Sequence, residues 1–137
     1  ADVDTVAAVA EAVGATVGNV FVVGALELLA AAEGACPAPV LGLRDGQVHV
    51  IDRVDDLEGA VASMARYLDA WPTGTGTQLR VAIGVADGRG AGVGAALASA
   101  IGGTPLVSDV VGFRLGPSAG SHTGPGTVSC FMFPTTT

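Results

Sequence analysis

Apolar residues recur along the chain at two spacings, one typical of helices and the other of strands. A spacing of three to four residues predicts helices at 3–13, 25–33, 55–71 and 93–101. β-Branched or alternating runs predict strands at 19–23, 40–43, 48–53, 79–85, 105–111 and 127–133. Because helices and strands interleave in this order, we predict an α/β fold of two layers: a mixed β-sheet with a hairpin, and helices packed on it.

Residues typical of helix ends and turns lie at the boundaries of these predicted helices and strands. Asp55 and Asp56 suit the start of the third helix, and Gly34 suits the end of the second. Arg-Asp-Gly-Gln at 44–47 carries the Asp-Gly signal of a hairpin. We expect the third helix to bury one apolar face, made of Leu57, Val61, Met64 and Leu68.

Composition narrows the class of protein. Half of the 137 residues are apolar and only 4% are aromatic, so one domain with an aliphatic core is expected. No apolar run approaches the roughly 20 residues that cross a bilayer, which predicts no membrane span. Asp2, Asp4 and Glu11 interrupt the first apolar residues, so no secretion signal is predicted and a cytoplasmic location is expected. The chain starts without Met, which also allows a fragment of a longer chain.

The charge argues against nucleic-acid and membrane binding, and the cysteines show no metal-binding pattern. The net charge is -7 and the six basic residues, all arginines, stand singly, so no basic stripe is available for nucleic acid or an anionic membrane. Cys36 and Cys130 belong to no metal-binding pattern, and both a single disulfide and two buried thiols remain open. No cofactor or metal is predicted.

A glycine-rich segment at 88–95, here called the glycine corner, follows a predicted strand and opens a predicted helix. Gly90, Gly92 and Ala95 formally satisfy a dinucleotide-binding fingerprint, and such glycines bring backbone amides close to a phosphate. The acidic residue expected about 20 positions later could only be Asp109. A tight strand-to-helix connection explains the same glycines, so a phosphate site and a structural corner are the two interpretations.

Four carboxylates gather before and within the start of the third helix. Paired carboxylates can hold a metal or transfer protons. Negative side chains also stabilise the first turn of a helix through its dipole, and we favour this capping role. We expect His49, on the preceding strand, to face solvent. The carboxylates are Asp52, Asp55, Asp56 and Glu58.

The densest candidate chemistry lies at 120–127, Gly-Ser-His-Thr-Gly-Pro-Gly-Thr, here called the His turn. Ser121, His122 and Thr123 can all donate hydrogen bonds to an anion, and the glycines allow a ligand to approach the backbone closely. Imidazole gains its charge near neutral pH, so it can meet a carboxylate as a cation. No metal ligands stand nearby, and neighbouring Ser and His do not form a triad. We interpret this segment as an anion-binding turn, with an inert surface connection as the alternative.

The His turn, followed by an apolar terminal strand, resembles the end of the DegV family. These bacterial proteins include the fatty-acid-binding subunits of fatty acid kinase. Val-Phe-Val-Val-Gly-Ala-Leu-Glu-Leu-Leu at 20–29 is similar to the family's strand and Leu-Glu helix. Pro-Val-Leu-Gly-Leu-Arg-Asp-Gly-Gln-Val at 39–48 is similar to its hairpin. The resemblance covers the whole chain but only the C-terminal half of a family member.

The resemblance implies a domain that binds lipid and has no catalytic residue of its own. Residues 1–137 would form a single C-terminal DegV domain, with the N-terminal domain absent from this chain. A long-chain fatty acid would lie between the two domains, and its carboxylate would be presented to a separate ATP-binding kinase subunit. His122 matches the family's carboxylate-contacting histidine. The expected ligand-binding residues are His122, Thr123, Ser121, Gly124 and Gly126.

Departures from the family pattern keep two other functions open. Arg-Val-Asp at 53–55 replaces a basic stretch after the hairpin, and Glu-Gly-Ala-Cys at 33–36 replaces Gly-Gly-Arg-Ile. One alternative is a nucleotide-binding or phosphate-binding domain that uses the glycine corner. The other is a degenerate domain retained for interaction with a partner.

Overall fold

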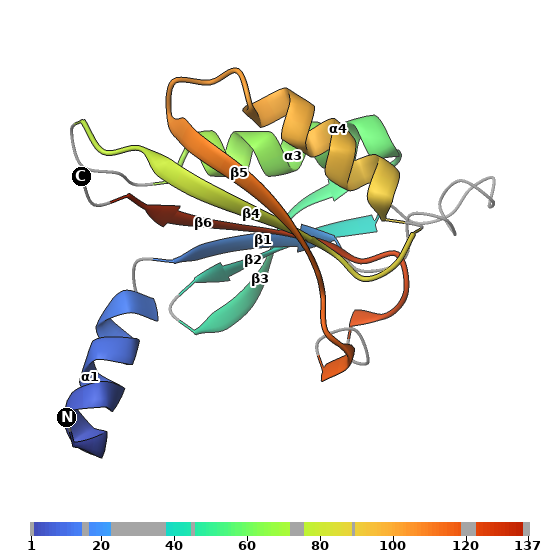
Figure 1. The fold of residues 1–137 in the computed structure, drawn as a ribbon. Helices are drawn as coiled ribbons and strands as arrows, with labels where there is room; N and C mark the ends of the chain where they lie inside the picture. The colour runs from blue at the N-terminus through green and yellow to red at the C-terminus, as the bar shows by residue number, and fades with distance from the viewer. Residues whose placement is uncertain are drawn as a thin grey trace.

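The fold is built on a six-stranded mixed β-sheet, as predicted (Figure 1). The computed structural model describes residues 2–14, 17–22, 38–44, 46–71, 76–88, 90–118 and 123–135. The strand order is β3-β2-β1-β6-β4-β5, in which β4 and β5 are parallel and the other neighbours antiparallel. The strands are β1 Gly18–Val22, β2 Ala38–Arg44, β3 Gln47–Val54, β4 Leu79–Val85, β5 Val107–Arg114 and β6 Val128–Pro134.

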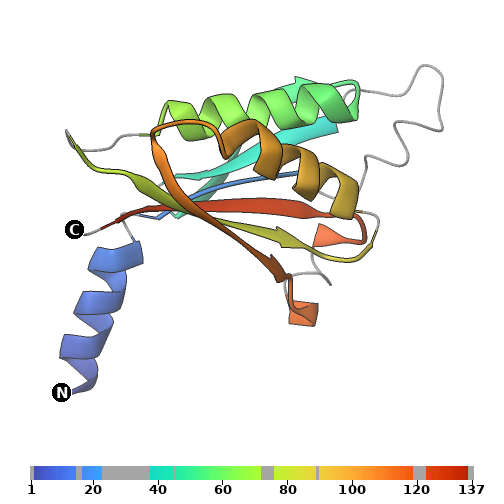
Figure 2. The same cartoon turned by 45° about the horizontal axis from the view of Figure 1, so that its top comes forward.

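Two helices cover one face of this sheet. They are α3 (Leu57–Asp69) and α4 (Ala91–Ile101), where α4 forms the crossover between parallel strands β4 and β5 (Figures 1 and 2). A third helix, α1 (Val3–Gly14), extends away from the sheet, and its residues 2–9 are exposed. The helix predicted at 25–33 lies outside the described residues. The two-layer α/β architecture is therefore confirmed.

Alternation along the strands separates a buried face from a helix-free face. Val128, Cys130 and Met132 of β6 are fully buried, together with Met64 and Leu68 of α3. Successive strand residues point to opposite faces, so Ser129, Phe131 and Phe133 lie on the other side. The register places Phe21 of β1 and Phe113 of β5 on this same side, where Phe113 contacts Phe131 with ring centroids 6.0 Å apart. The helix-free face is thus largely apolar.

The ends of several elements differ from the prediction. β5 runs from 107 to 114 rather than from 105 to 111, because the chain first makes a turn after α4, held by the Thr104 N–H donating to the Ile101 carbonyl at 3.2 Å. Helix α4 begins at Ala91, two residues earlier than predicted. The hairpin is confirmed, since Arg44 pairs with Gln47 and Gly46 adopts φ of 74°.

Helix α3 buries a different face from the one predicted. Its buried residues are Ala60, Ser63, Met64 and Leu68, and Val61 is half-buried. Leu57, expected in the core, is 50% exposed because the helix begins at this residue and packs on the sheet only from Ala60 onward. The expected face is therefore correct in its second half and wrong at Leu57.

The contrast between Leu57 and Leu68 yields a stability test. Leu68→Ala should lower the free energy of unfolding by about 2–5 kcal/mol, because it empties a fully buried site in the core. Leu57→Ala, the same chemical change at a half-exposed site, should cost less than about 1 kcal/mol. Urea denaturation followed by circular dichroism measures both, and equal losses would contradict the arrangement of α3.

Candidate functional site

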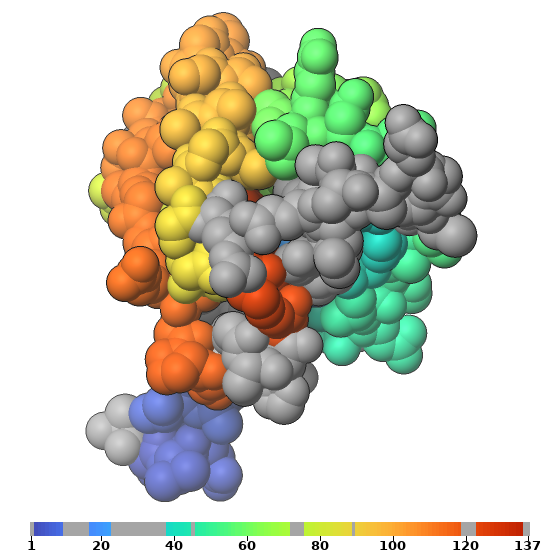
Figure 3. Space-filling model, turned by 90° about the vertical axis from the view of Figure 1, so that its right-hand side faces the viewer, coloured from blue at the N-terminus to red at the C-terminus, as the bar shows by residue number. Residues whose placement is uncertain are grey.

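Two segments that the sequence singled out separately meet at one end of the sheet. Strands β4 and β5 end there and β6 begins there, since Val85 pairs with Arg114 on one side and Val128 on the other. The Ala86 N–H donates to the Thr127 carbonyl at 3.0 Å, which joins the glycine corner to the His turn. Figure 3 views this end of the molecule, with the start of α4 in yellow and the turn before β6 in red-orange. The first and third predicted sites therefore form one region.

The described part of the His turn, residues 123–127, is closed by a buried hydroxyl. The Thr127 hydroxyl lies 3.0 Å from the Thr123 carbonyl oxygen and 2.8 Å from that of Gly124, to which it donates. Gly124 and Gly126 adopt φ of 85° and 79°, a backbone conformation that glycine alone reaches without strain. Ser121 and His122 lie outside the described residues, so their predicted roles stay predictions. Residues 123–127, which follow them, form a constrained turn.

The glycine corner packs tightly against this turn. A Cβ atom at Gly90 would lie 2.9 Å from Val128 Cγ2 and 3.2 Å from the Thr127 carbonyl oxygen. A Cβ at Gly94 would lie 3.0 Å from Val85 Cγ1. Two of the four glycines thus allow close packing of α4, as the structural interpretation of this segment predicts. Gly90, the residue before α4, has no side chain that could cap the helix, and the Ala91 N–H donates to the Gly88 carbonyl at 3.4 Å.

An apolar groove of about 550 Å³ runs between α4 and β5 and reaches the same corner. Ile83, Val85 and Val110 contribute large side chains to it. Its other apolar lining residues, apart from Val111 and Phe113, are small: Ala91, Gly94, Ala95, Ala98 and Gly112. A Cβ at Gly112 would meet open space, so this position leaves the groove unfilled. The volume lies within the roughly 300–1,000 Å³ typical of small-molecule sites.

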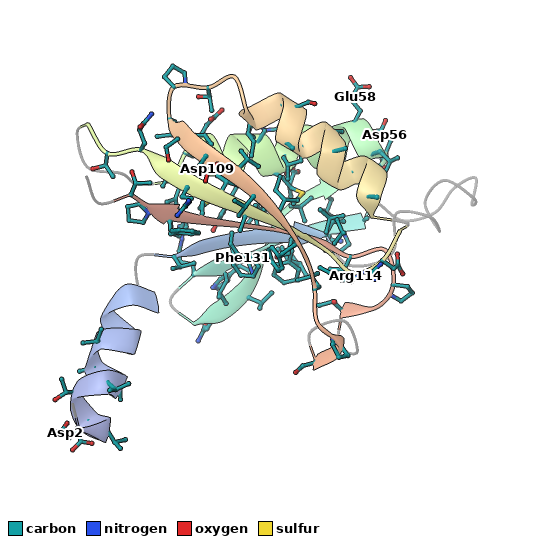
Figure 4. All side chains as sticks on the ribbon, in the orientation of Figure 1. Asp2, Asp56, Glu58, Asp109, Arg114 and Phe131 are labelled. Carbon is teal, nitrogen blue, oxygen red and sulfur yellow. The ribbon has the colours of Figure 1, made fainter. Side chains whose placement is uncertain are left out.

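Arg114 is the charged residue that lines the groove, and the sequence reasoning missed it. It is the last residue of β5, at the strand end shown in Figure 4. Arg66 and Arg80 form ion pairs with Asp52 and Asp109 at 3.1 and 3.0 Å. Arg114 makes no such bond with any residue that the structure describes. Its exposed side chain therefore stands at one end of an apolar groove, beside the N-terminus of α4.

Comparisons with solved structures decide the fold. A fatty-acid-binding DegV-family protein from Streptococcus agalactiae superimposes with a TM-score of 0.76 over 98% of this chain and 50% of that chain, at 18% identity. A fatty-acid-binding DegV-family protein from Thermus thermophilus gives a TM-score of 0.72 over 98% and 51%, at 25% identity. One from Eubacterium eligens, loaded with heptadecanoic acid, gives 0.69 over 97% and 51%, at 12% identity. The chain has the DegV fold.

The comparison with the DegV structures covers only part of those proteins. This chain spans about half the length of each of them. Those named by function are described as fatty-acid-binding or lipid-binding proteins, not as enzymes, which agrees with the prediction of a non-catalytic domain. No protein-family model and no curated protein matches the sequence. None of the described helices is long and apolar enough to cross a membrane.

The acidic residues of the DegV-like domain have structural roles. The Asp56 carboxylate accepts a hydrogen bond from the Gly59 N–H at 2.7 Å and caps α3, so the capping interpretation is confirmed for Asp56. The pKa of Asp52 is lowered by hydrogen bonds from the Ser63 side chain and the Arg53 backbone and by the charge of Arg66. Asp109, the candidate partner of a dinucleotide, pairs with Arg80 instead. Within the described ranges no three potential ligands cluster around a metal position.

Cys130 is a buried free thiol, as one of the two interpretations of the cysteines predicted. Burial raises its pKa to about 12, because the thiolate would lose its hydration in the core. Cys36 lies outside the described residues. Cys130 therefore contributes packing between β1 and β4 rather than reactive chemistry.

The Thr127 hydroxyl gives a test of the turn. Thr127→Val keeps the side-chain shape but removes the hydroxyl that donates to the Gly124 carbonyl, so it should cost about 0.5–1.5 kcal/mol of stability. It should also speed amide hydrogen exchange of the Ala86 N–H, which donates to the Thr127 carbonyl. Thr127→Ser retains the hydroxyl and serves as the control. If both variants behave alike, the hydroxyl does not close the turn.

Proposed function

We propose that this chain is the C-terminal, lipid-binding domain of a DegV-type protein and contributes to a long-chain fatty-acid site. The observation that carries this proposal is the apolar groove between α4 and β5, which ends at Arg114, an arginine with no ion-pair partner among the described residues. The DegV fold supports the same ligand class, since several proteins of that fold are named as fatty-acid binders.

The groove suits the hydrocarbon part of such a ligand. Its small residues on α4 and the empty position at Gly112 leave room for a chain that carries no polar groups. Burying about 15 methylenes completely would contribute on the order of 10 kcal/mol at about 0.8 kcal/mol each. An open groove covers only one side of the chain and therefore supplies part of this energy.

The corner suits the carboxylate. The first amides of α4 carry the positive end of the helix dipole, and Arg114 adds a full positive charge. Gly90 contacts the His turn, and Ala91, the next residue, lines the groove, so both parts adjoin one helix terminus. In this proposal His122 donates to the carboxylate, and Ser121, Thr123, Gly124 and Gly126 complete the turn around it.

The helix-free face of the sheet gives the absent half of the site a place to pack. Phe113, whose ring contacts that of Phe131, is 40% exposed there, and Val111 is 42% exposed. Exposed apolar surface of this kind marks an interface. We assign it to the N-terminal domain, which would meet the lipid site along the edge of β5, because Val111 and Phe113 also line the groove. The bound carboxylate would then be presented to a separate ATP-binding kinase subunit, with no catalytic step performed by this chain.

Filling the groove tests the lipid site. Palmitate should raise the melting temperature of the protein, because it binds the folded state alone. Gly112→Leu places a side chain in the open space of the groove and should abolish this increase. Gly103→Leu, where a Cβ also meets open space but outside the groove, is the matched control. If palmitate raises the melting temperature of Gly112→Leu as much as that of the unsubstituted protein, the groove is not the lipid site.

Replacing His122 separates the three candidate functions. In the lipid proposal His122→Ala should weaken palmitate binding roughly tenfold or more, the loss expected for a hydrogen bond to a charged group. Native mass spectrometry after bacterial expression measures the retained acyl chain. Stabilisation by ATP or NAD, with no response to palmitate, would favour the nucleotide alternative. An interaction domain would bind neither ligand, and His122→Ala would change nothing.

A further inference from the structure

A second pocket lies at the opposite end of the sheet from the region where the glycine corner meets the His turn. It occupies about 240 Å³ between the β2–β3 hairpin and the last turns of α3, and its lining is Gly42, Arg44, His49, Ile51 and Tyr67. We call it the hairpin pocket. Val40 pairs with Val22, at the end of the sheet where β6 begins. Arg44 ends β2 four residues farther along, at the turn of the hairpin. The two regions are therefore separate.

The sheet register brings the polar residues of the hairpin pocket to one face. Gly42 and Arg44 are two residues apart on β2 and point to the same side, and His49 pairs directly with Gly42. The sequence predicted that His49 would face solvent. It is exposed, but it faces the α3 side of the sheet and lines a pocket there.

Tyr67 closes the pocket from above because residue 42 has no side chain. A Cβ at Gly42 would lie 3.1 Å from the Tyr67 hydroxyl oxygen and 3.2 Å from Tyr67 Cε2. The Tyr67 ring is also held by Trp71, with ring centroids 5.8 Å apart. The phenol is thus fixed over the hairpin, with its hydroxyl group near Arg44 and His49 in the shared lining.

Arg44, His49 and Tyr67 can all donate hydrogen bonds, and none of the described lining residues carries a carboxylate. None of the three has a hydrogen bond or ion pair within the described part of the chain. The protein carries a net charge of -7 and only six arginines, two of which are committed to the ion pairs of Arg66 and Arg80. A guanidinium, an imidazole and a phenol therefore line one pocket, and no described residue forms a hydrogen bond or ion pair with any of them.

We propose that the hairpin pocket binds a small oxyanion, of the phosphate or carboxylate class, with Arg44 as the main ligand and His49 and Tyr67 as further donors. A guanidinium donates two parallel hydrogen bonds to either group. The pocket volume is less than half that of the lipid groove, so it suits a compact anion rather than an acyl chain. This site does not depend on the fatty-acid proposal.

Titration of the protein with inorganic phosphate, and separately with acetate, tests the site at constant ionic strength. Two-dimensional amide NMR should show saturable shifts in the hairpin and the end of α3. Arg44→Ala should weaken the binding about tenfold or more, since a charged hydrogen bond is lost. Tyr67→Phe, which removes one oxygen and keeps the ring, should weaken it severalfold. The anion that binds more tightly, phosphate or acetate, identifies the chemical class of the ligand.

Arg53→Ala is the matched control. Arg53 is an exposed arginine of the same hairpin with no ion pair to a described residue, and its register with Pro39 places it on the helix-free face. The affinity of the Arg53→Ala protein for the anion should stay within about twofold of that of the unsubstituted protein. Equal losses in Arg44→Ala and Arg53→Ala would indicate nonspecific charge attraction and overturn the proposal. Absence of saturable shifts with both anions, or shifts confined to the Arg114 corner, would overturn it as well.

Discussion

Insertion of the C-terminal strand into the middle of the sheet is the constraint on which the rest of the structure depends. β6 pairs with β1 on one side and with β4 on the other, so residues more than 100 positions apart, such as Asn19 and Ser129, hydrogen-bond at 2.8 Å. Without β6 the hairpin half and the βαβ half of the sheet would share no backbone hydrogen bonds. The same insertion brings the His turn to the ends of β4 and β5, because the turn immediately precedes the strand.

The two helices leave different surfaces beside them because their side chains differ. α3 carries Met64 and Leu68 and fills its side of the sheet. α4 is made largely of alanine and glycine, so its core contacts depend on Val93, Leu97 and Ile101, and its other face stays shallow above β5. A groove follows from this composition, since side chains too short to reach the outer strand leave apolar surface open. The aliphatic, alanine-rich composition thus shapes the site as well as the core.

Local patterns predicted most elements, and long-range pairing explains what they missed. The alternation of 79–85 and the Asp-Gly turn at 45–46 depend on neighbouring residues, so sequence alone sufficed for β4 and the hairpin. The exposure of Leu57 depends on where α3 meets the sheet. The positions of Arg114 and His49 beside pockets depend on strand order and register, which no local spacing encodes. The glycine corner and the His turn were each visible, but their contact was not.

Net charge sets a condition on any anion that this protein binds. A chain of charge -7 repels anions at long range, and salt screens that repulsion within about 10 Å at 0.1 M. Binding must then come from donors in direct contact. Arg66 and Arg80 are neutralised by Asp52 and Asp109, whereas Arg44 and Arg114 line the two pockets described above and have no ion-pair partner among the described residues. Both arginines stand beside apolar or aromatic side chains, which lower the local dielectric constant and strengthen a hydrogen bond to an anion. The distribution of paired and unpaired arginines therefore marks both ends of the sheet as places where an acidic ligand can overcome the charge of the whole protein.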